Sequence, residues 1–322
     1  MKAVVCADWG PAESLSIQEL PSPPLGAGQV RVKVHACGVN FADTLMIQGK
    51  YQVRPERPFS PGIEIAGEIA EVAEGVAHLK PGMRVMGLAN HGGFAEEVVT
   101  HAGTVLPMPP GMDFTTAAGF PVVYGTSHLA LAHRGRLKVG ETLLVFGAAG
   151  GVGLAAVEIG KKMGARVIAC ASTPEKLEVA KAHGADELID YSKEDVVARV
   201  KALGGADVVY DPVGGSAFEA ALKVTKFEGR ILIIGFAGGT IPQIPANILL
   251  VKNIEAIGVL WGNYTQLAPK ILQGSLTQLL GWYAEGALKP HVSETFPLER
   301  AADALNALSG RKSTGKVVVT VR

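Results

Sequence analysis

The sequence has few cysteines and no long apolar run. Its 322 residues include only Cys6, Cys37 and Cys170, which are too few and too scattered for a disulfide framework or a paired zinc site. No stretch reaches the roughly 18 apolar residues that a membrane span needs. The first residues form no continuous apolar signal region, so a soluble, cytoplasmic protein is expected.

An excess of charge of one sign is also missing. The chain has 30 basic and 30 acidic side chains and no basic cluster, which argues against nucleic acid or an anionic membrane as a partner. Apolar residues are abundant, at 48% against 19% charged residues, as is typical of a folded protein with a buried core. The length predicts about two domains.

Two patterns divide the chain. Residues 1–118 hold short strands between prolines and glycines, predicted at 14–20, 29–36, 63–73 and 83–88. From residue 119 onward strands alternate with helices, and these strands are predicted at 142–146, 166–170, 186–189, 206–210, 229–235 and 254–260. We therefore predict an α/β fold. Residues 119–261 form a doubly wound parallel domain, and residues 1–118 with 262–322, including a helix at 298–309 and a strand at 316–321, form a largely β domain.

A glycine-rich turn follows the strand at 142–146 and leads into a helix. Its residues are Gly147, Ala148, Ala149, Gly150, Gly151, Val152 and Gly153. Gly147 allows a tight turn, Gly150 lets backbone N–H groups approach a pyrophosphate, and Gly153 lets the helix pack on the strand. Spaced glycines are weak evidence in a chain with 40 of them, and a purely structural turn is the alternative. The strand–turn–helix context favours a dinucleotide site.

The next strand, at 166–170, ends without an acidic residue. Enzymes that prefer NAD place Asp or Glu there to bind the ribose hydroxyls. Here Ser172 and Thr173 follow, with Lys176 one helical turn further. A serine donor and a lysine charge suit a 2′-phosphate, so we expect NADPH rather than NADH. The alternative is that Ser172 or Thr173 only caps a helix, and the nearby Glu175 weakens the preference.

Several segments together resemble the zinc-independent quinone oxidoreductase branch of the medium-chain dehydrogenase/reductase superfamily, over nearly the whole chain. They are residues 35–43, 61–67, 81–85, the glycine turn and 313–316. Residues 235–239 and 259–264 are most similar to the quinone oxidoreductase-like protein 2 group. The resemblance implies that the largely β domain is GroES-like and catalytic. It also implies a homodimer through the edge strand 254–260, because a long apolar edge is rarely left open.

Metal-dependent members of that superfamily have a zinc cysteine where this chain has Asn40 and a zinc histidine where it has Ile63. An amide and an isoleucine replace two good ligands, so no metal is expected. Zinc stabilises the alkoxide in alcohol oxidation as a Lewis acid. The resemblance therefore implies hydride transfer from NADPH to an acceptor that delocalises charge itself, such as a quinone or an enone.

The resemblance also implies where the acceptor binds. Asn40 is expected to bind the acceptor oxygen or the cofactor through its amide, and Asp43 to hold neighbouring backbone in place. The alternative is that Asn40 only caps a helix at 41–48. Some relatives have a tyrosine two residues after the aspartate, but Leu45 occupies that position here. The candidate proton donors are Tyr51, which we count in the catalytic set, Tyr124 and Tyr264.

Further cofactor contacts follow from the same resemblance. They are expected from Tyr124, Thr126, Tyr191, Gly235, Phe236, Trp261 and Lys316. Thr126 is assigned to the nicotinamide, with a simple helix start as the alternative. Tyr191 is assigned to the 2′-phosphate end, and Phe236 to the end of a strand, where ligands lie in such sheets. Lys316 is assigned to the phosphates, although a basic residue at a strand start is more often at the surface.

Three functions remain open. The leading one is an NADPH-dependent quinone reductase. The second is a 2-alkenal or enoyl-thioester reductase whose substrate arm reaches Trp261 and Tyr264, and the third is a non-catalytic NADPH-binding protein with a structural or RNA-associated role. His35, His128 and His133 have no carboxylate spaced to orient them and are expected to be structural.

Overall fold

The structure, a computed structural model, describes residues 1–322 and divides into two compact units. The first unit comprises Met1–Pro121 and Pro290–Arg322, and the second comprises Val122–Lys289. The second boundary lies at 289/290 rather than at the predicted 261/262. The reason is that α10 (Pro269–Ala284) and the residues after it bind within the second unit. His128 Nδ1 lies 2.8 Å from Ser275 Oγ, and Lys162 Nζ lies 2.9 Å from a carboxylate oxygen of Glu285.

The first unit is built on a seven-stranded sheet that is antiparallel except for one pair. Its neighbouring strands are β14 (Val292–Pro297), β15 (Lys316–Thr320), β3 (Gln29–Gly38), β4 (Glu64–Val72), β5 (Arg84–Leu88) and β7 (Val105–Pro107), while β6 (Glu97–His101) pairs with β3. A separate antiparallel pair consists of β1 (Lys2–Val5) and β2 (Ser16–Glu19). Val32 and Val34 on β3 are fully buried and Lys33 between them is exposed, as the sequence alternation predicts.

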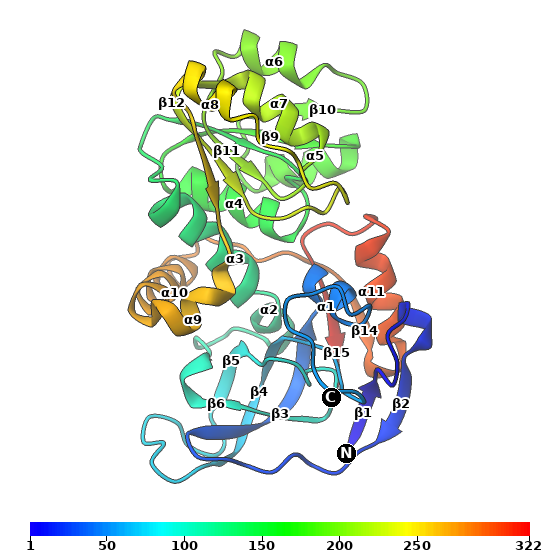
Figure 1. Cartoon of the computed structure of the whole chain (residues 1–322). Coiled ribbons are helices and arrows are strands. Elements are labelled where there is room, and N and C mark those ends of the chain that lie inside the picture. Colours follow the sequence, from blue (N-terminus) through cyan, green and yellow to red (C-terminus); the bar gives the residue numbers. More distant parts are fainter. The chain divides into compact units, whose positions relative to one another are not determined.

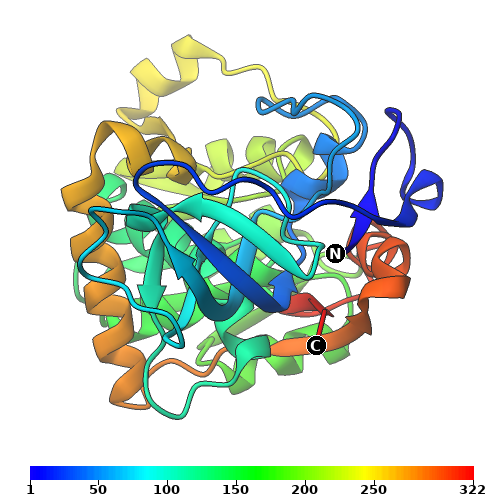
Figure 2. The ribbon, with the colours of Figure 1, turned by 90° about the horizontal axis from the view of Figure 1, so that it is seen from below.

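Short helices complete the first unit. They are α1 (Phe41–Met46), α2 (Phe114–Ala118) and α11 (Ala301–Ser309), with 3₁₀ turns at Ala12–Ser14, Ala102–Thr104 and Leu298–Arg300. Leu305 on α11 and Val317 and Val319 on β15 belong to one apolar core. The N- and C-termini lie close together on one side of this unit (Figures 1 and 2).

The second unit contains a six-stranded sheet in which every neighbouring pair is parallel. The order is β10 (Glu187–Asp190), β9 (Arg166–Ala171), β8 (Thr142–Val145), β11 (Ala206–Asp211), β12 (Thr225–Ile233) and β13 (Glu255–Gly258). This is the doubly wound Rossmann order, in which the direction of winding reverses between β8 and β11. Two strands differ from prediction by more than one residue at an end: β12 begins four residues and ends two residues earlier, and β13 ends two residues earlier.

Helices cover both faces of this sheet (Figure 1). One face packs against α6 (Val196–Ala202), α7 (Ser216–Val224) and α8 (Ala246–Lys252), and the other against α4 (Gly151–Lys162) and α5 (Pro174–Ala182). The central strands β8 and β9 are apolar after their first residue because both of their faces are buried. Three further segments are α3 (Pro121–His128), which continues as a π-helix over Leu129–Arg134, the 3₁₀ turn Trp261–Asn263 and α9 (Tyr264–Leu267). None of the helices has the length and apolar composition needed to cross a membrane.

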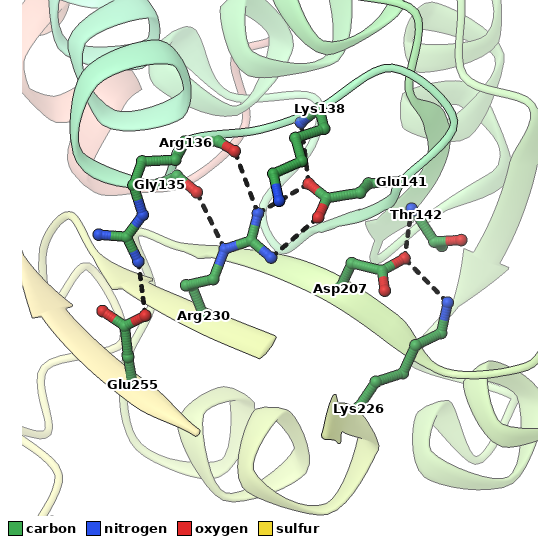
Figure 3. A network of polar contacts seen from close by, with 9 residues as sticks. All are labelled: Gly135, Arg136, Lys138, Glu141, Thr142, Asp207, Lys226, Arg230 and Glu255. Carbon is green, nitrogen blue, oxygen red and sulfur yellow. Dashed lines mark hydrogen bonds and ion pairs between the residues drawn. The ribbon is translucent and has the colours of Figure 1, made fainter. Parts of the chain in front are cut away.

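Ion pairs tie together the amino ends of the parallel strands (Figure 3). The guanidinium of Arg230 donates to both carboxylate oxygens of Glu141 at 3.0 and 2.7 Å and to the carbonyl of Gly135 at 2.9 Å. Nearby, Asp207 accepts from Lys226 Nζ at 2.8 Å. Arg230 and Glu141 are largely buried, so this network stabilises the sheet at the amino ends of its strands, opposite to the end that carries the glycine turn.

Candidate dinucleotide site

The glycine turn after β8 has the geometry that its sequence predicts. Gly147 has a φ of +57°, which favours glycine, and it lies where β8 leaves the sheet. A Cβ added to Gly153 would lie 2.1 Å from the Gly147 carbonyl oxygen, so only glycine permits this packing. A Cβ on Gly150 would find its nearest atom at 3.4 Å. The turn therefore leaves the N-terminus of α4 open, and such a terminus attracts anions.

The carboxyl ends of β11 and β12 meet beside this turn. A Cβ on Gly147 would lie 3.4 Å from Val213, and the backbone N–H of Gly238 donates to the Val213 carbonyl at 2.8 Å. Gly235 and Phe236 lie just beyond β12, whose last residue is Ile233, rather than at its predicted end. These residues line the point where the winding direction reverses, which is where ligands bind in doubly wound sheets.

The carboxyl ends of β9 and β10 bring together the residues predicted for a 2′-phosphate. Thr173 is the N-cap of α5, and its hydroxyl accepts from the Lys176 N–H at 3.3 Å. Ser172 is therefore not the cap, and it is half-buried. The Tyr191 N–H donates to the carbonyl of Ala171 at 3.1 Å, which places Tyr191, itself half exposed, next to Ser172.

Lys193 is a further cation at this end that was missed from the sequence. Its ammonium lies 3.5 Å from Asp190 Oδ2, just beyond β10. Hydrogen bonds from its own backbone N–H and from Thr173, together with the charge of Lys193, hold the pKa of Glu175 below its ordinary value. Lys193 thus offsets the acid that weakened the expected preference for NADPH. The available signal was a lysine two residues after Tyr191.

Two predicted residues on α3 have different surroundings. Tyr124 donates its hydroxyl to Glu158 Oε2 at 2.5 Å, and burial followed by the charge of Glu158 raises its pKa well above the ordinary range. This hydroxyl is buried and its proton is already donated to Glu158, which disfavours the predicted cofactor contact. Thr126 is buried as well and remains the candidate on this helix. Glu158 also binds His183 Nδ1 at 2.7 Å, a pair that the sequence did not reveal because 25 residues separate its members.

The three histidines expected to be structural make no ion pair. His35 stacks on Phe114 with ring centroids 4.1 Å apart. His128 binds Ser275, as described above, and His133 contacts the edge of Tyr264 with ring centroids 6.0 Å apart. Tyr264 therefore takes part in an aromatic contact at the start of α9.

In the first unit, Asn40 and Lys316 belong to a buried polar network. Lys316 Nζ donates to Val39 O, Asn40 Oδ1 and Glu64 Oε2, each at 2.9 Å. Asn40 Nδ2 donates to Gly38 O at 3.2 Å and to Glu64 Oε2 at 3.0 Å. Both amide hydrogens and all three ammonium hydrogens are therefore used. This placement favours a structural role for Lys316 over the predicted phosphate contact, and it leaves Asn40 no free donor for an acceptor oxygen.

Asp43 holds the backbone around this network, as expected from the sequence. Its carboxylate accepts from the Asn40 N–H at 2.8 Å and from the Gly62 N–H at 3.2 Å. Burial raises the pKa of Asp43 to about 7 despite these hydrogen bonds. Burial and the charge of Asp43 also raise the pKa of Tyr51, which therefore keeps its proton at neutral pH.

The residues at the zinc positions of metal-dependent relatives have other roles here. Asn40 lies in the network above, and Ile63 packs against the apolar core of the first unit. Burial raises the pKa of the Cys37 thiol well above its ordinary value, which disfavours the thiolate that binds metals. No group of three or more His, Cys, Asp or Glu side chains is arranged to hold a metal ion.

Comparisons with known proteins agree over the full length. Residues 26–110 match the family model described as alcohol dehydrogenase GroES-like domain, and residues 151–277 match the one described as zinc-binding dehydrogenase. The chain is 41% identical to quinone oxidoreductase-like protein 2 of Bos taurus, over 100% of this chain and 93% of that protein. It is 43% identical to a homolog of that protein in Nematostella vectensis, over 100% and 89%.

Solved structures give the same result. The quinone oxidoreductase of Thermus thermophilus, whose complex with NADPH is also known, is 38% identical with a TM-score of 0.87, and both chains are covered completely. The Escherichia coli quinone oxidoreductase complexed with NADPH is 27% identical with a TM-score of 0.94, again over both whole chains. The chain belongs to the medium-chain dehydrogenase/reductase superfamily. Its place within it is the quinone oxidoreductase branch, in the group of the quinone oxidoreductase-like protein 2 relatives.

Proposed function

We propose that the protein is an NADPH-dependent reductase that transfers hydride to a quinone without a metal ion. The observation that carries the cofactor choice is the end of β9, where Ser172 and Lys176 stand in place of an acid and Tyr191 lies alongside. A carboxylate there would repel a 2′-phosphate, whereas a hydroxyl donor and an ammonium bind it. Lys193 adds a second positive charge at the same end.

The residues present fit NADPH along the carboxyl edge of the sheet. The glycine turn and the N-terminus of α4 accommodate the pyrophosphate, because side chains are excluded at Gly153 and absent at Gly150. Ser172, Lys176 and Tyr191 hold the adenosine end, and Thr126 with Phe236 orients the nicotinamide end. When bound, NADPH supplies the hydride.

The acceptor follows from what replaces the zinc ligands. Asn40 and Ile63 are poor zinc ligands and would not hold a metal ion that acts as a Lewis acid. The acceptor itself must therefore delocalise the negative charge that hydride transfer brings, as a quinone does. Reduction to the hydroquinone then requires one hydride and one proton. We assign the proton to the hydroxyl of Tyr51, with Asp43 and Asn40 as positioning residues, because Asp43 accepts from the Asn40 N–H at 2.8 Å.

We also propose a homodimer through the edge of the six-stranded sheet. β13 has a neighbouring strand on one side only, and Leu250 and Val251 on the adjacent helix α8 are largely exposed. A second copy would cover this edge and those side chains. A mass from light scattering that stays monomeric at all concentrations would contradict this arrangement.

Oxidation of NADPH by the chelator-treated protein tests the reaction. The panel contains ortho-quinones, para-quinones and 2-alkenals, each with NADH in parallel. We expect turnover of quinones with NADPH preferred. Turnover of alkenals alone would change the substrate class, and tight binding without any turnover would favour a non-catalytic protein.

Ser172→Asp tests the cofactor pocket separately. The new carboxylate repels the 2′-phosphate, so the ratio of kcat/KM for NADPH to that for NADH falls by about 10- to 100-fold, the value of a charge-assisted hydrogen bond. Ser172→Asn is the matched control, because it places a side chain of the same size as aspartate at this position without the negative charge. An unchanged ratio in Ser172→Asp would refute the assignment of this pocket.

A further inference from the structure

Trp261 is a buried side chain between two exposed neighbours. It begins the 3₁₀ turn that follows β13 and therefore lies at the carboxyl edge of the sheet. Only 6% of Trp261 is exposed, whereas Leu260 before it is 46% exposed and Gly262 after it is also exposed. The chain thus turns this indole inward at the edge where ligands bind in such folds.

The indole lies directly on the backbone of α3. A Cβ added to Gly125 would be 2.6 Å from Trp261 Nε1 and 2.7 Å from Cε2 and Cζ2. Any side chain at this position would therefore displace the ring. Gly125 is next to Thr126, the residue assigned above to the nicotinamide, and α3 continues into a π-helix, a rare form that is frequent at functional sites.

The Nε1–H group of Trp261 has no hydrogen-bond partner within the chain. This group is the only polar atom of the side chain, and it can only donate. A buried donor without an acceptor costs free energy, and native structures almost always satisfy such groups. The missing partner is therefore a hydrogen-bond acceptor that the chain itself does not provide.

We propose that Trp261 Nε1–H donates a hydrogen bond to the carboxamide oxygen of the nicotinamide of NADPH. The inference rests on the proposed NADPH function and extends it by naming the donor that fixes the ring. The carboxamide is the polar substituent of that ring, and its carbonyl oxygen is a strong acceptor. The contact of Gly125 with the indole fixes the donor beside Thr126, so that the two residues orient the ring from the same side of the second unit.

Trp261→Phe tests the proposal by equilibrium binding, independently of turnover. Phenylalanine keeps an aromatic ring but removes the donor, so the Kd for NADPH measured by calorimetry rises by about 3- to 10-fold. The Kd for adenosine 2′,5′-bisphosphate, which has no nicotinamide, stays unchanged. Trp282→Phe is the matched control, because it makes the same change on α10 of the same unit, and it leaves both affinities unchanged.

Each other outcome overturns the proposal in a distinct way. Equal weakening of both ligands would mean that Trp261 only supports the fold. Unchanged NADPH affinity with a raised KM for the quinone would mean that the donor serves the acceptor. Native protein that binds neither ligand would refute the NADPH function itself. If Trp261→Phe does not fold, Gly125→Ala gives the same test, because the added methyl displaces the indole and should weaken NADPH alone.

Discussion

The amino ends and the carboxyl ends of the parallel strands in the six-stranded sheet differ in how fully their polar groups are paired. At the amino edge Arg230 satisfies Glu141 and two backbone carbonyls, and Asp207 binds both Lys226 and the N–H of Thr142 (Figure 3). At the carboxyl ends the turn after β8 carries the glycines Gly147, Gly150 and Gly153, and the buried Trp261 N–H is left without a partner.

This difference separates stability from binding within one sheet. Groups that are fully paired contribute to the folded state and have no capacity left for a ligand. Groups left unpaired cost stability, and they are available to a bound molecule. Changes at the amino edge should therefore alter unfolding, and changes at the carboxyl edge should alter NADPH affinity.

The largest expected effect is on stability, from Arg230→Met. Removal of the guanidinium leaves the carboxylate of Glu141 without its charged partner, with only the Lys138 N–H still donating to it, and leaves two carbonyls unpaired in a largely buried position. This costs about 3–5 kcal/mol in the free energy of unfolding. The NADPH affinity of the folded protein should change by less than about twofold, because distant sites act independently.

Urea unfolding and NADPH titration measure the two quantities. Lys226→Met is the matched control at the same edge, where the ion pair is partly exposed and removal costs about 1 kcal/mol or less. A large loss of NADPH affinity in folded Arg230→Met would contradict the claim that the amino ends of the strands serve stability and the carboxyl ends serve binding.

The converse change is Gly153→Ala at the carboxyl edge. The added Cβ would overlap the Gly147 carbonyl, so the turn must move, at a cost of about 1–3 kcal/mol in stability. Because we propose that the turn forms the pyrophosphate site, NADPH binding should be lost in calorimetry. Gly160→Ala on the same helix is the comparison: its Cβ would lie 2.5 Å from the buried side chain of Leu143 and 3.4 Å from Val167, so it also costs stability, but it leaves the backbone of the turn in place and should retain binding. Native NADPH affinity in Gly153→Ala would contradict the assignment of the turn.

The third prediction concerns pH. Burial alone would raise the pKa of Glu141, but hydrogen bonds from Arg230 and from the Lys138 N–H hold it below its ordinary value of 4.5. Its stabilising contribution is therefore complete above pH 4.5 and is lost as the pH falls through the folded-state pKa. Acid titration of the unfolding free energy should show a smaller loss below pH 4.5 in Glu141→Gln than in the native protein. Identical acid profiles would be evidence against this ion pair.

The smallest effect is expected from Lys193→Ala. The side chain is largely exposed, so its attraction for a 2′-phosphate is screened and worth about 1 kcal/mol or less. The Kd for NADPH should rise by up to about fivefold at low salt, and the effect should shrink in high salt, while the Kd for NADH stays constant. A salt-independent loss for both cofactors would point to a structural role.

The sheet of the second unit could be predicted well from the sequence because its signals are local. The central strands hold short apolar runs, Gly147 of the turn has a positive φ, and Gly153 is required by its close contact with the backbone of Gly147. The boundary after β13 was wrong by 28 residues, since α10 joins the second unit through contacts with His128 and Lys162 that are distant in sequence.

The site shows the same division. The positions of Ser172, Lys176 and Tyr191 after the strand ends could be predicted from the sequence, whereas their contacts with a cofactor stay a prediction. The hydrogen bonds from Lys316 to Glu64 and from Tyr124 to Glu158 could not be predicted, because each partner comes from a distant segment of the chain. A polar residue's role depends on whether its hydrogen bonds are already used, and only the three-dimensional contacts reveal this.

The most direct test of the cofactor pocket compares the binding of NADPH and NADH to the native protein by calorimetry at low salt. The two cofactors differ only in the 2′-phosphate, so the ratio of their Kd values measures the pocket at the ends of β9 and β10. We predict that NADPH binds at least about tenfold more tightly, as expected for a charge-assisted hydrogen bond. Equal affinities, or tighter binding of NADH, would contradict this prediction.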